Sequence, residues 1–262
     1  DHGADGEVVV TDGRGRGRDA ARKLVQQGVE TVVVWGGDGT VNEVASQLVG
    51  CGVALGIVPA GSGNGLAREL GLSMHPAHAL RTALAGPIRD IDAGELGGRL
   101  FFNVAGVGFD ASLAAAFNVR ERRGMSGYLA AALREALRYE PARYDVDADG
   151  GGSSGAALLV AVANTRQYGN GAIIAPAARP DDGRLDVVVV PPIGLLAAGW
   201  HMRRLFRGTL DGLQGVRMLR MREGAIAASQ PLTFHVDGEV VRGERRLPIA
   251  VHPRALPVRI PA

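Results

Sequence analysis

Two glycine-rich stretches are the strongest candidates for a ligand-binding site in this sequence. They are Gly36-Gly37-Asp38-Gly39-Thr40 and Gly61-Ser62-Gly63-Asn64, and each follows an apolar run and opens an expected helix. Glycine lets the backbone approach a phosphate closely, and a helix start presents unpaired N–H groups at the positive end of its dipole. Two such turns in tandem predict a nucleotide polyphosphate site. Asp38, inside the first turn, is placed to serve a metal or a second substrate.

Apolar runs predict the strands and helices on either side of these turns. Residues 31–35 and 53–58 are continuous apolar runs, as expected of strands covered on both faces, and residues 7–11 form a shorter strand-like run. Apolar side chains then recur at helical spacing after each glycine turn; these are Val41, Val44, Ala45 and Leu48, and then Leu66, Ala67 and Leu70. An earlier helix is expected to be capped by Asp19. The pattern predicts a doubly wound parallel α/β domain with ligands at the carboxyl ends of its strands.

Strand-like runs dominate from Asp92 onward. They cover residues 100–104, 157–163, 185–190, 216–222, 232–236 and 247–251. A helix is expected at residues 126–139, and residues 150–155, all glycine or serine, are expected to be a flexible hairpin tip. We therefore predict two domains: an α/β nucleotide-binding domain of residues 1–91 plus 253–262, and an antiparallel β-sandwich-like domain of residues 92–252. The tail at residues 256–260 is expected to return to the first domain as a strand.

Composition excludes several classes of protein. The chain is 46% hydrophobic and 21% charged with a net charge of +2, and it has no apolar run long enough to span a bilayer. Lys23 is the only lysine and lies in an expected helix, so neither a Walker-type phosphate loop nor a protein kinase lysine is present. Aromatic residues make up 5%, too few for base stacking, so no nucleic-acid partner is expected. The single Cys51 excludes an internal disulfide and fits a reducing cytosol.

Three acidic stretches each have a structural and a functional interpretation. Val236-Asp237-Gly238-Glu239 by itself reads as a hairpin turn with an exposed acid, and Asp181-Asp182-Gly183 reads as a turn whose oxygens also suit a hard cation. Asp110 ends an apolar stretch. It would either line the substrate cleft, join a magnesium–water network with Asp38, or cap a helix.

The ordered motifs resemble the diacylglycerol kinase catalytic family, which includes bacterial lipid kinases and sphingosine kinases. The resemblance is carried by Gly-Gly-Asp-Gly-Thr-Val-Asn-Glu at 36–43, Pro-Ala-Gly-Ser-Gly-Asn-Gly-Leu-Ala-Arg at 59–68, Phe-Asn-Val-Ala-Gly-Val-Gly-Phe-Asp at 102–110, Tyr-Gly-Asn-Gly at 168–171 with Ala-Pro at 175–176, Pro-Asp-Asp-Gly-Arg-Leu-Asp at 180–186, and Val-Asp-Gly-Glu at 236–239. It covers essentially the whole chain.

The resemblance implies an ATP- and magnesium-dependent lipid kinase that phosphorylates a lipid hydroxyl, such as that of diacylglycerol or a sphingoid base, in phospholipid metabolism. ATP would lie in a cleft between the two domains. The implied nucleotide contacts are Thr11, Gly36, Gly37, Asp38, Gly39, Thr40, Val41, Asn42 and Ser62. Glu239 would be the general base, with Asp38 also catalytic. A structural Mg²⁺ would be held by Asp182 and by backbone oxygens near Arg179 and Arg184.

The sequence also departs from the family pattern. The usual first strand and Asn-Pro-x-Ser-Gly loop have no counterpart before Asp1, so we expect the chain to begin at the second strand. Alternatives that stay open are an NAD kinase-like or phosphofructokinase-like kinase, which share a glycine-Asp-glycine turn, and a non-catalytic nucleotide- or lipid-binding module.

Two arginine-rich stretches bear on membrane contact. Residues 120–123 contain three arginines, and residues 194–210 combine Trp200 and Phe206 with Arg203, Arg204 and Arg207. The second stretch would either lie on an anionic bilayer or pack on the sandwich with a solvated basic face. We expect a cytoplasmic protein, peripheral at the inner face of the membrane if that contact is made. A homodimer stays open. The six histidines, among them His201 and His235, show no metal-ligand spacing.

Overall fold

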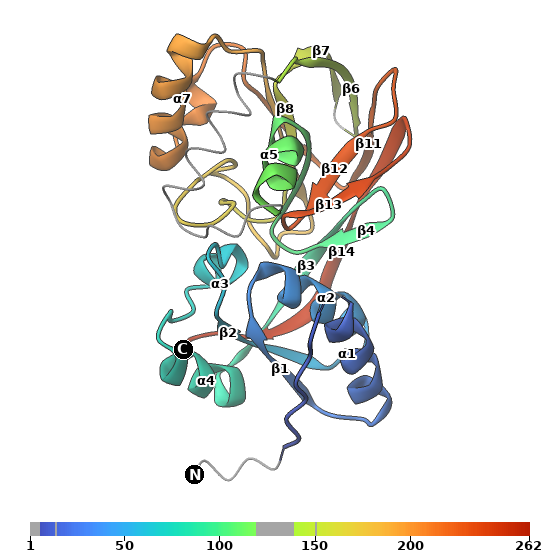
Figure 1. Cartoon of the computed structure of the whole chain (residues 1–262), viewed down its shortest axis with the longest axis vertical. Coiled ribbons are helices and arrows are strands. Elements are labelled where there is room, and N and C mark those ends of the chain that lie inside the picture. The colour runs from blue at the N-terminus through green and yellow to red at the C-terminus, as the bar shows by residue number, and fades with distance from the viewer. Residues whose placement is uncertain (1–5, 14, 119–138, 150) are drawn as a thin grey trace. The chain divides into compact units, whose positions relative to one another are not determined.

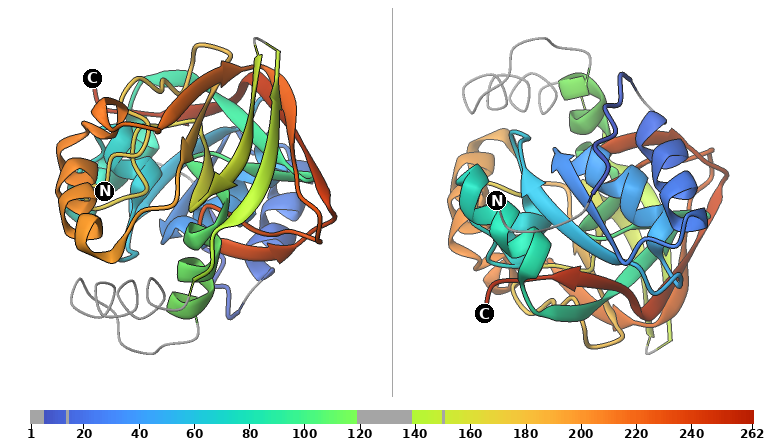
Figure 2. Two further views of the ribbon diagram at one scale, coloured as in Figure 1. Left: turned by 90° about the horizontal axis from the view of Figure 1, so that it is seen from above. Right: turned by 90° about the horizontal axis from the view of Figure 1, so that it is seen from below.

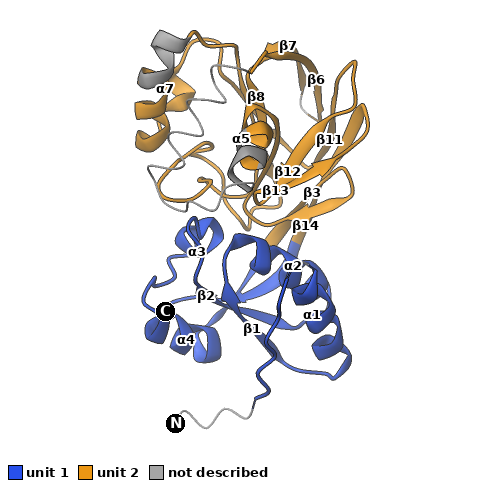
Figure 3. Ribbon diagram, in the orientation of Figure 1, with its two compact units in different colours: residues 1–91, 254–262 blue, residues 92–253 orange. Residues whose placement is uncertain are grey.

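The chain forms two compact units. The computed structural model describes residues 6–13, 15–118, 139–149 and 151–262. Unit 1 contains residues 1–91 and 254–262, and unit 2 contains residues 92–253 (Figure 3). Strands β3 (Ile88–Leu96) and β14 (Arg246–Arg259) each begin in one unit and end in the other. Unit 1 is therefore discontinuous in sequence.

Unit 1 is a parallel α/β unit. Strand β1 (Thr31–Gly36) pairs in parallel with β2 (Ala54–Pro59), and the end of β14 pairs in parallel with β2 at Val258 and Leu55. The helices are α1 (Arg16–Gln26), α2 (Asp38–Leu48), α3 (Gly65–Glu69) and α4 (Pro76–Ala85). They flank the strands on both sides, with α1 and α2 opposite α3 and α4 (Figures 1 and 2). The predicted doubly wound arrangement is confirmed.

Burial explains why unit 1 folds as the sequence predicts. Every residue of β2 is buried, so its continuous apolar run marks a strand covered on both faces. The predicted apolar faces of α2 and α3 are buried too. Two predictions are wrong. Residues 7–11 form no strand and are exposed, and α1 begins at Arg16 after Gly15 in the left-handed conformation, which places Asp19 inside the first turn.

Unit 2 consists largely of two sheets. The first contains β4 (Arg99–Phe101), β6 (Ala142–Ala148), β7 (Gly151–Ala157) and β11 (Glu223–Ala227) with parts of β3 and β14. The second is antiparallel in the order β10-β9-β8-β5-β12-β13, with bounds Arg217–Met221, Leu185–Val190, Leu159–Ala163, Val104–Gly108, Thr233–Val236 and Glu239–Arg242. Helices α5 (Phe109–Asn118) and α7 (Leu195–Arg207) and a short 3₁₀ turn (Leu210–Gly212) complete the described part. The predicted β-sandwich-like fold is confirmed.

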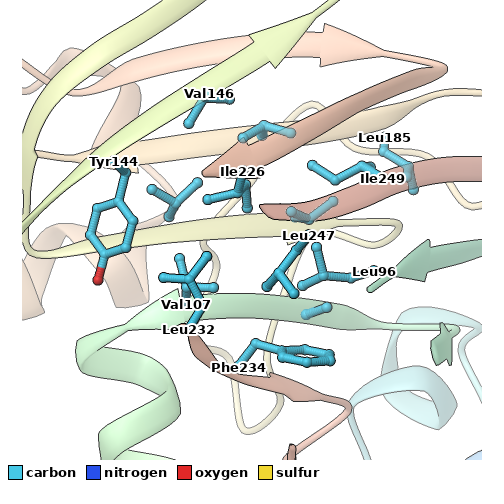
Figure 4. Packing of buried hydrophobic residues seen from close by; sticks show 14 of the residues in the cluster. Leu96, Val107, Tyr144, Val146, Leu185, Ile226, Leu232, Phe234, Leu247 and Ile249 are labelled. Atoms are coloured by element: carbon cyan, nitrogen blue, oxygen red, sulfur yellow. The ribbon is translucent and has the colours of Figure 1, made fainter. Parts of the chain in front are cut away.

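The core of unit 2 lies between its two sheets. Side chains from both sheets interdigitate there, including Val107, Ile226, Phe234, Leu247 and Ile249 (Figure 4). A second apolar cluster covers the other face of the antiparallel sheet and includes Leu210, with Leu205 of α7 packed against it. Both faces of β8 are therefore buried, which accounts for its unbroken apolar sequence.

The structure corrects other expectations for unit 2. The glycine- and serine-rich stretch at residues 151–157 is the edge strand β7, paired with β6, and not a flexible tip. Strands β6 and β11 were not predicted. Residues 126–138 of the expected helix and the arginines at 120–123 lie outside the described residues, and Tyr139 is not helical. Within the described part of the chain, no helix has the length and apolarity needed to cross a membrane.

Candidate functional site

The two glycine turns of unit 1 lie directly against each other. Gly36 at the end of β1 pairs with Pro59 at the end of β2, and the N–H of Ala60 donates to the Gly36 carbonyl at 2.9 Å. A Cβ placed on Gly37 would lie 3.0 Å from the Cα of Gly61. Only glycine allows such an approach of two backbones. The prediction that both turns end at the same sheet edge is confirmed.

Asp38 fastens the first turn to the second. Its carboxylate oxygens Oδ1 and Oδ2 accept hydrogen bonds from the backbone N–H groups of Gly65 and Asn64, both at 2.8 Å. Asn64, in the left-handed conformation, closes its own turn with Oδ1 accepting from Gly61 N at 2.8 Å. Three amides of the second turn are therefore already bonded to side chains of unit 1. Ser62 and Gly63 lie between Gly61 and Asn64 in this turn, and a contact of Ser62 with phosphate stays a prediction.

We predict that Asp38→Asn loosens both turns. The asparagine amide offers one acceptor oxygen and turns its NH₂ group toward a second N–H donor, so one backbone amide loses its partner. The expected cost is about 1–3 kcal/mol in the free energy of unfolding, with weaker Mg-ATP binding. Urea unfolding and calorimetry measure both. Asp19→Asn, in the exposed first turn of α1, is the control and should change neither. Unchanged unfolding and unchanged ATP affinity in Asp38→Asn would contradict this role.

The other predicted nucleotide contacts have different exposures. Gly36 is necessary for the side chain of Thr40, because a Cβ at residue 36 would lie 2.8 Å from the Thr40 Cβ. Val41 and Asn42 are buried within α2, and the Val41 N–H donates to the Gly37 carbonyl at 3.0 Å. Thr11 is exposed in an irregular segment. The structure thus groups residues 36–42 and 61–65 at one sheet edge, and the role of each in binding stays a prediction.

Glu239 stands at the end of a tight hairpin in unit 2. It is the first residue of β13 and pairs with Val236, the last residue of β12. The two turn residues between them, Asp237 and Gly238, have φ of 47° and 86°. Positive φ at both positions is typical of a type I′ hairpin turn. The Glu239 side chain is half-buried and makes no hydrogen bond or ion pair with the described residues.

Asp237 anchors this hairpin to a neighbouring loop. Its carboxylate accepts hydrogen bonds from three consecutive backbone N–H groups: Phe102 at 2.9 Å, Asn103 at 2.9 Å and Val104 at 3.1 Å. Its own N–H donates to the Val104 carbonyl at 3.0 Å. Charge-assisted bonds of this kind are stronger than neutral ones. Asp237 therefore fixes where Glu239 lies relative to β5.

Asp110 and His235 form a buried pair behind the same hairpin. Asp110, in the first turn of α5, has Oδ2 at 3.2 Å from His235 Nε2 and accepts a hydrogen bond from the Tyr168 hydroxyl at 3.1 Å. His235 Nδ1 accepts from the Gly238 N–H at 3.4 Å. A Cβ on Gly106 would lie 2.3 Å from Asp110 Oδ2, so glycine leaves room for the carboxylate. These contacts reach the residue that precedes Glu239.

Sequence reasoning identified Asp110 but missed its partners. His235 stood out in the sequence only as one of six histidines without metal-ligand spacing, and in the structure it is buried beside Asp110. The alternation along β12 places it on the face opposite Phe234, which could have indicated a second packed face. Nearby, burial raises the pKa of Tyr144, whose hydroxyl lies 3.1 Å from that of Tyr139. The placement of Asp110 in a substrate cleft stays a prediction.

The Pro-Asp-Asp-Gly loop is held by carboxylates. Asp92 is fully buried, and its Oδ2 accepts from the Gly183 N–H at 2.7 Å. Asp182 Oδ1 accepts from the Arg184 N–H at 3.1 Å, and its other oxygen pairs with Arg220. The loop is therefore held by its own Asp182 together with Asp92 of β3 and Arg220 of β10.

Asp186 adds a second carboxylate near Asp182. It is 5% exposed, its Oδ2 has no hydrogen-bond partner in the described chain, and the Nε of Arg220 lies 3.7 Å away. Burial raises the pKa of Asp186 to about 6, with Arg220 opposing the rise and Asp182 adding to it. Carboxylate and backbone oxygens suit a hard cation such as Mg²⁺. No three His, Cys, Asp or Glu side chains gather as ligands among the described residues, so backbone oxygens near Arg179 and Arg184 would be needed.

Two family profiles together match most of the chain. Residues 1–96 match the diacylglycerol kinase catalytic domain, and residues 103–260 match the YegS C-terminal NAD kinase beta sandwich-like domain. A protein of Pseudomonas aeruginosa PAO1 named a probable lipid kinase, YegS-like, is 35% identical over 258 residues, covering 92% of this chain and 82% of that protein. A protein of the same name from Klebsiella pneumoniae is 31% identical over 269 residues, covering 100% and 88%.

Solved structures share the fold at lower identity. A diacylglycerol kinase from Bacillus anthracis has a TM-score of 0.75 at 22% identity, covering 95% of this chain and 84% of that one. An NAD kinase from Archaeoglobus fulgidus in complex with ATP has a TM-score of 0.50 at 14% identity, covering 95% and 90%. At these identities the likeness establishes the fold and nothing about the acceptor.

Proposed function

We propose, since this chain belongs to the diacylglycerol kinase catalytic domain family, that it transfers the γ-phosphate of ATP to the hydroxyl group of a lipid. The observation that carries the proposal is the contact between the two glycine turns of unit 1, joined by Asp38. Glycine-rich backbone at a helix N-terminus is a favourable binding site for nucleotide phosphates. The acceptor is a lipid alcohol such as diacylglycerol or a sphingoid base.

The glycine turns would hold the phosphates. Helix α2 begins at Asp38, so the N–H groups of its first turn lie at the positive end of the helix dipole. Phosphoryl transfer depends mostly on positioning and on offsetting the charge of the phosphate oxygens. Asp38 acts on this site by keeping both turns in place, in addition to any contact with a metal-bound phosphate.

Glu239 would act as the general base. Its carboxylate takes the proton of the lipid hydroxyl as that oxygen forms a bond to the γ-phosphorus, and the bond between the γ-phosphorus and the bridging oxygen of ADP breaks. Asp237 and the Asp110–His235 pair position the hairpin for this step. Mg²⁺ bound with ATP would offset phosphate charge, and a further Mg²⁺ would be held by Asp182 and backbone oxygens near Arg179 and Arg184.

An acceptor assay tests the function. The purified protein is incubated with Mg²⁺ and ATP labelled at the γ-phosphate, together with diacylglycerol, a sphingoid base, NAD or fructose 6-phosphate. We expect label in an organic-extractable product that depends on the lipid. Label transferred to NAD or to the sugar phosphate would instead favour the rival kinases, whose fold the NAD kinase likeness supports. Binding of Mg-ATP by calorimetry without transfer to any acceptor would identify a non-catalytic module.

A further inference from the structure

Helix α7 contacts the rest of unit 2 through Leu205 and through its C-terminal end. Leu205 packs against the apolar cluster on the outer face of the antiparallel sheet, and its carbonyl accepts a hydrogen bond from the Ile173 N–H at 3.0 Å. At the end of the helix, Gly208 adopts the left-handed conformation and Arg204 Nη1 donates to the Thr209 carbonyl at 3.1 Å. The helix lies on the outside of its unit (Figure 1). Its orientation is therefore fixed, with the opposite face turned to solvent.

The outward face of α7 combines large aromatic side chains with arginines. Trp200 is 57% exposed and Phe206 is 43% exposed, and Arg203 and Arg207 are exposed with them. At 100° per residue, these four positions fall within about one third of the helix circumference. Among the described residues few large apolar side chains reach this exposure. The solvent face of a surface helix typically carries charged and polar residues, so two exposed aromatic rings on one face are unusual.

The charge of this segment is entirely positive. Residues 194–210 contain three arginines and no aspartate or glutamate. The guanidinium of Arg204 lies 5.8 Å from the centre of the Trp200 ring, so the arginine and the indole form one amphipathic surface. Aromatic rings with adjacent arginines are the composition of surfaces that rest at the headgroup level of anionic membranes.

We propose that the outward face of α7, formed by Trp200, Arg203, Phe206 and Arg207, docks the protein on an anionic phospholipid bilayer. The aromatic rings enter the headgroup region, and the arginines contact lipid phosphates. This inference deepens the proposed function, since a lipid acceptor resides in a bilayer. The reason for membrane docking rests on the proposed kinase function, whereas the binding itself does not. A second copy of the chain is the competing occupant, and its surface would have to supply acidic residues opposite the arginines.

Vesicle sedimentation in the absence of ATP tests the proposal. The full chain is mixed with vesicles of phosphatidylcholine alone, or of equal parts phosphatidylcholine and phosphatidylglycerol. We expect binding to the anionic vesicles that weakens as salt rises. Replacing both Arg203 and Arg207 by Glu should lower the partition coefficient by at least about 30-fold, since each arginine near such a surface contributes roughly five-fold. Trp200→Ala with Phe206→Ala should lower it on the order of ten-fold.

Matched control variants distinguish vesicle binding by this face from non-specific binding of the protein to vesicles. Trp35→Ala removes a tryptophan that is 61% exposed in unit 1, and Arg81→Glu reverses an exposed arginine of α4. Both should bind vesicles as the unaltered protein does. Equal binding by the α7 variants, or equal loss in the controls, overturns the proposal. So does a concentration-dependent dimer, seen by sedimentation equilibrium, that Trp200→Ala abolishes without any vesicle binding.

Activity in detergent keeps the two proposals distinguishable. Transfer of phosphate to short-chain diacylglycerol dispersed in detergent needs no bilayer, so the α7 variants should keep it within about three-fold, the usual small effect of surface substitutions. Vesicle binding without transfer to any acceptor would contradict the kinase function and leave the docking face standing. Transfer in detergent with no vesicle binding by the unaltered protein would overturn the docking face alone.

Discussion

Glu239→Gln is expected to lower kcat by about a hundred- to ten-thousand-fold, the range in which general-base catalysis contributes. Glutamine has nearly the same shape as glutamate but cannot take a proton at neutral pH. Because the Glu239 side chain is half-buried and bonds to no described residue, the thermal midpoint should not change. The affinity for Mg-ATP, measured by calorimetry, should not change either. Steady-state kinetics with a lipid acceptor would show the loss in kcat.

The control for this prediction lies in the same region of the chain. Glu244 is exposed five residues further on, and its carbonyl accepts a hydrogen bond from the Leu232 N–H. Glu244→Gln removes the same charge and should keep wild-type turnover. If a folded Glu239→Gln protein turns over within about three-fold of the unaltered protein, far below the expected loss, the base is another residue.

Asp237→Ala is expected to destabilise unit 2 and to slow the reaction. Three backbone N–H groups lose a charged acceptor, and alanine must adopt the left-handed conformation that Asp237 holds at φ 47°. Hydrogen bonds to charged groups and the left-handed conformation each contribute, and the combined cost is about 2–4 kcal/mol in the free energy of unfolding. Displacing Glu239 by an ångström would also lower kcat on the order of a hundred-fold. Urea unfolding and kinetics on the still-folded fraction measure the two effects.

Two further variants divide the effect of Asp237→Ala. Asp237→Asn tolerates the left-handed conformation but offers one acceptor oxygen, so it should lie between wild type and alanine. Asp211→Ala removes an exposed aspartate that accepts a single backbone bond, from Gly212 at 3.1 Å, and should cost less than about 1 kcal/mol. Equal unfolding midpoints for Asp237→Ala and Asp211→Ala would show that the three-amide anchor does not stabilise the fold.

The fold was predictable wherever burial of an element produces a simple apolar pattern in the sequence. β2 is a continuous apolar run because it is buried throughout, whereas β1 is apolar although its burial alternates and Trp35 is exposed. The predicted ends of both strands lie within one residue of the observed ones. β6 was missed although Tyr144 and Val146 alternate with exposed residues, a weaker pattern of period two. β7 was mistaken for a loop because its glycines and serines have low strand propensity. The backbone pairing of β7 with β6 stabilises the strand although its side chains do not favour one.

The candidate site was predictable as motifs and not as contacts. Glycine spacing indicated the two turns of unit 1, but nothing local indicates that Asp38 bonds to the amides of residues 64 and 65, which are 26 and 27 positions away. Likewise the Asp-Gly dipeptide predicts a hairpin turn, while the anchoring of Asp237 depends on a loop 133 to 135 positions earlier. Such long-range bonds follow from topology. The diacylglycerol kinase resemblance is confirmed at the level of the family.

The late arrival of β14 governs how unit 1 can fold. Its last residues complete the sheet beside β2, and Arg259 ties Thr31 Oγ1 and the Gly86 carbonyl together at 3.1 Å and 2.9 Å. On a ribosome residues 1–91 emerge before residues 92–262, yet β2 keeps an open edge until residue 258 has been synthesised. Unit 1 therefore cannot complete its sheet before unit 2 has been synthesised, which differs from the usual N-terminal-first order of domain folding. Unit 2, contiguous from residue 92 to 253, can fold earlier. The sheet that carries the glycine turns is completed only when β14 pairs with β2.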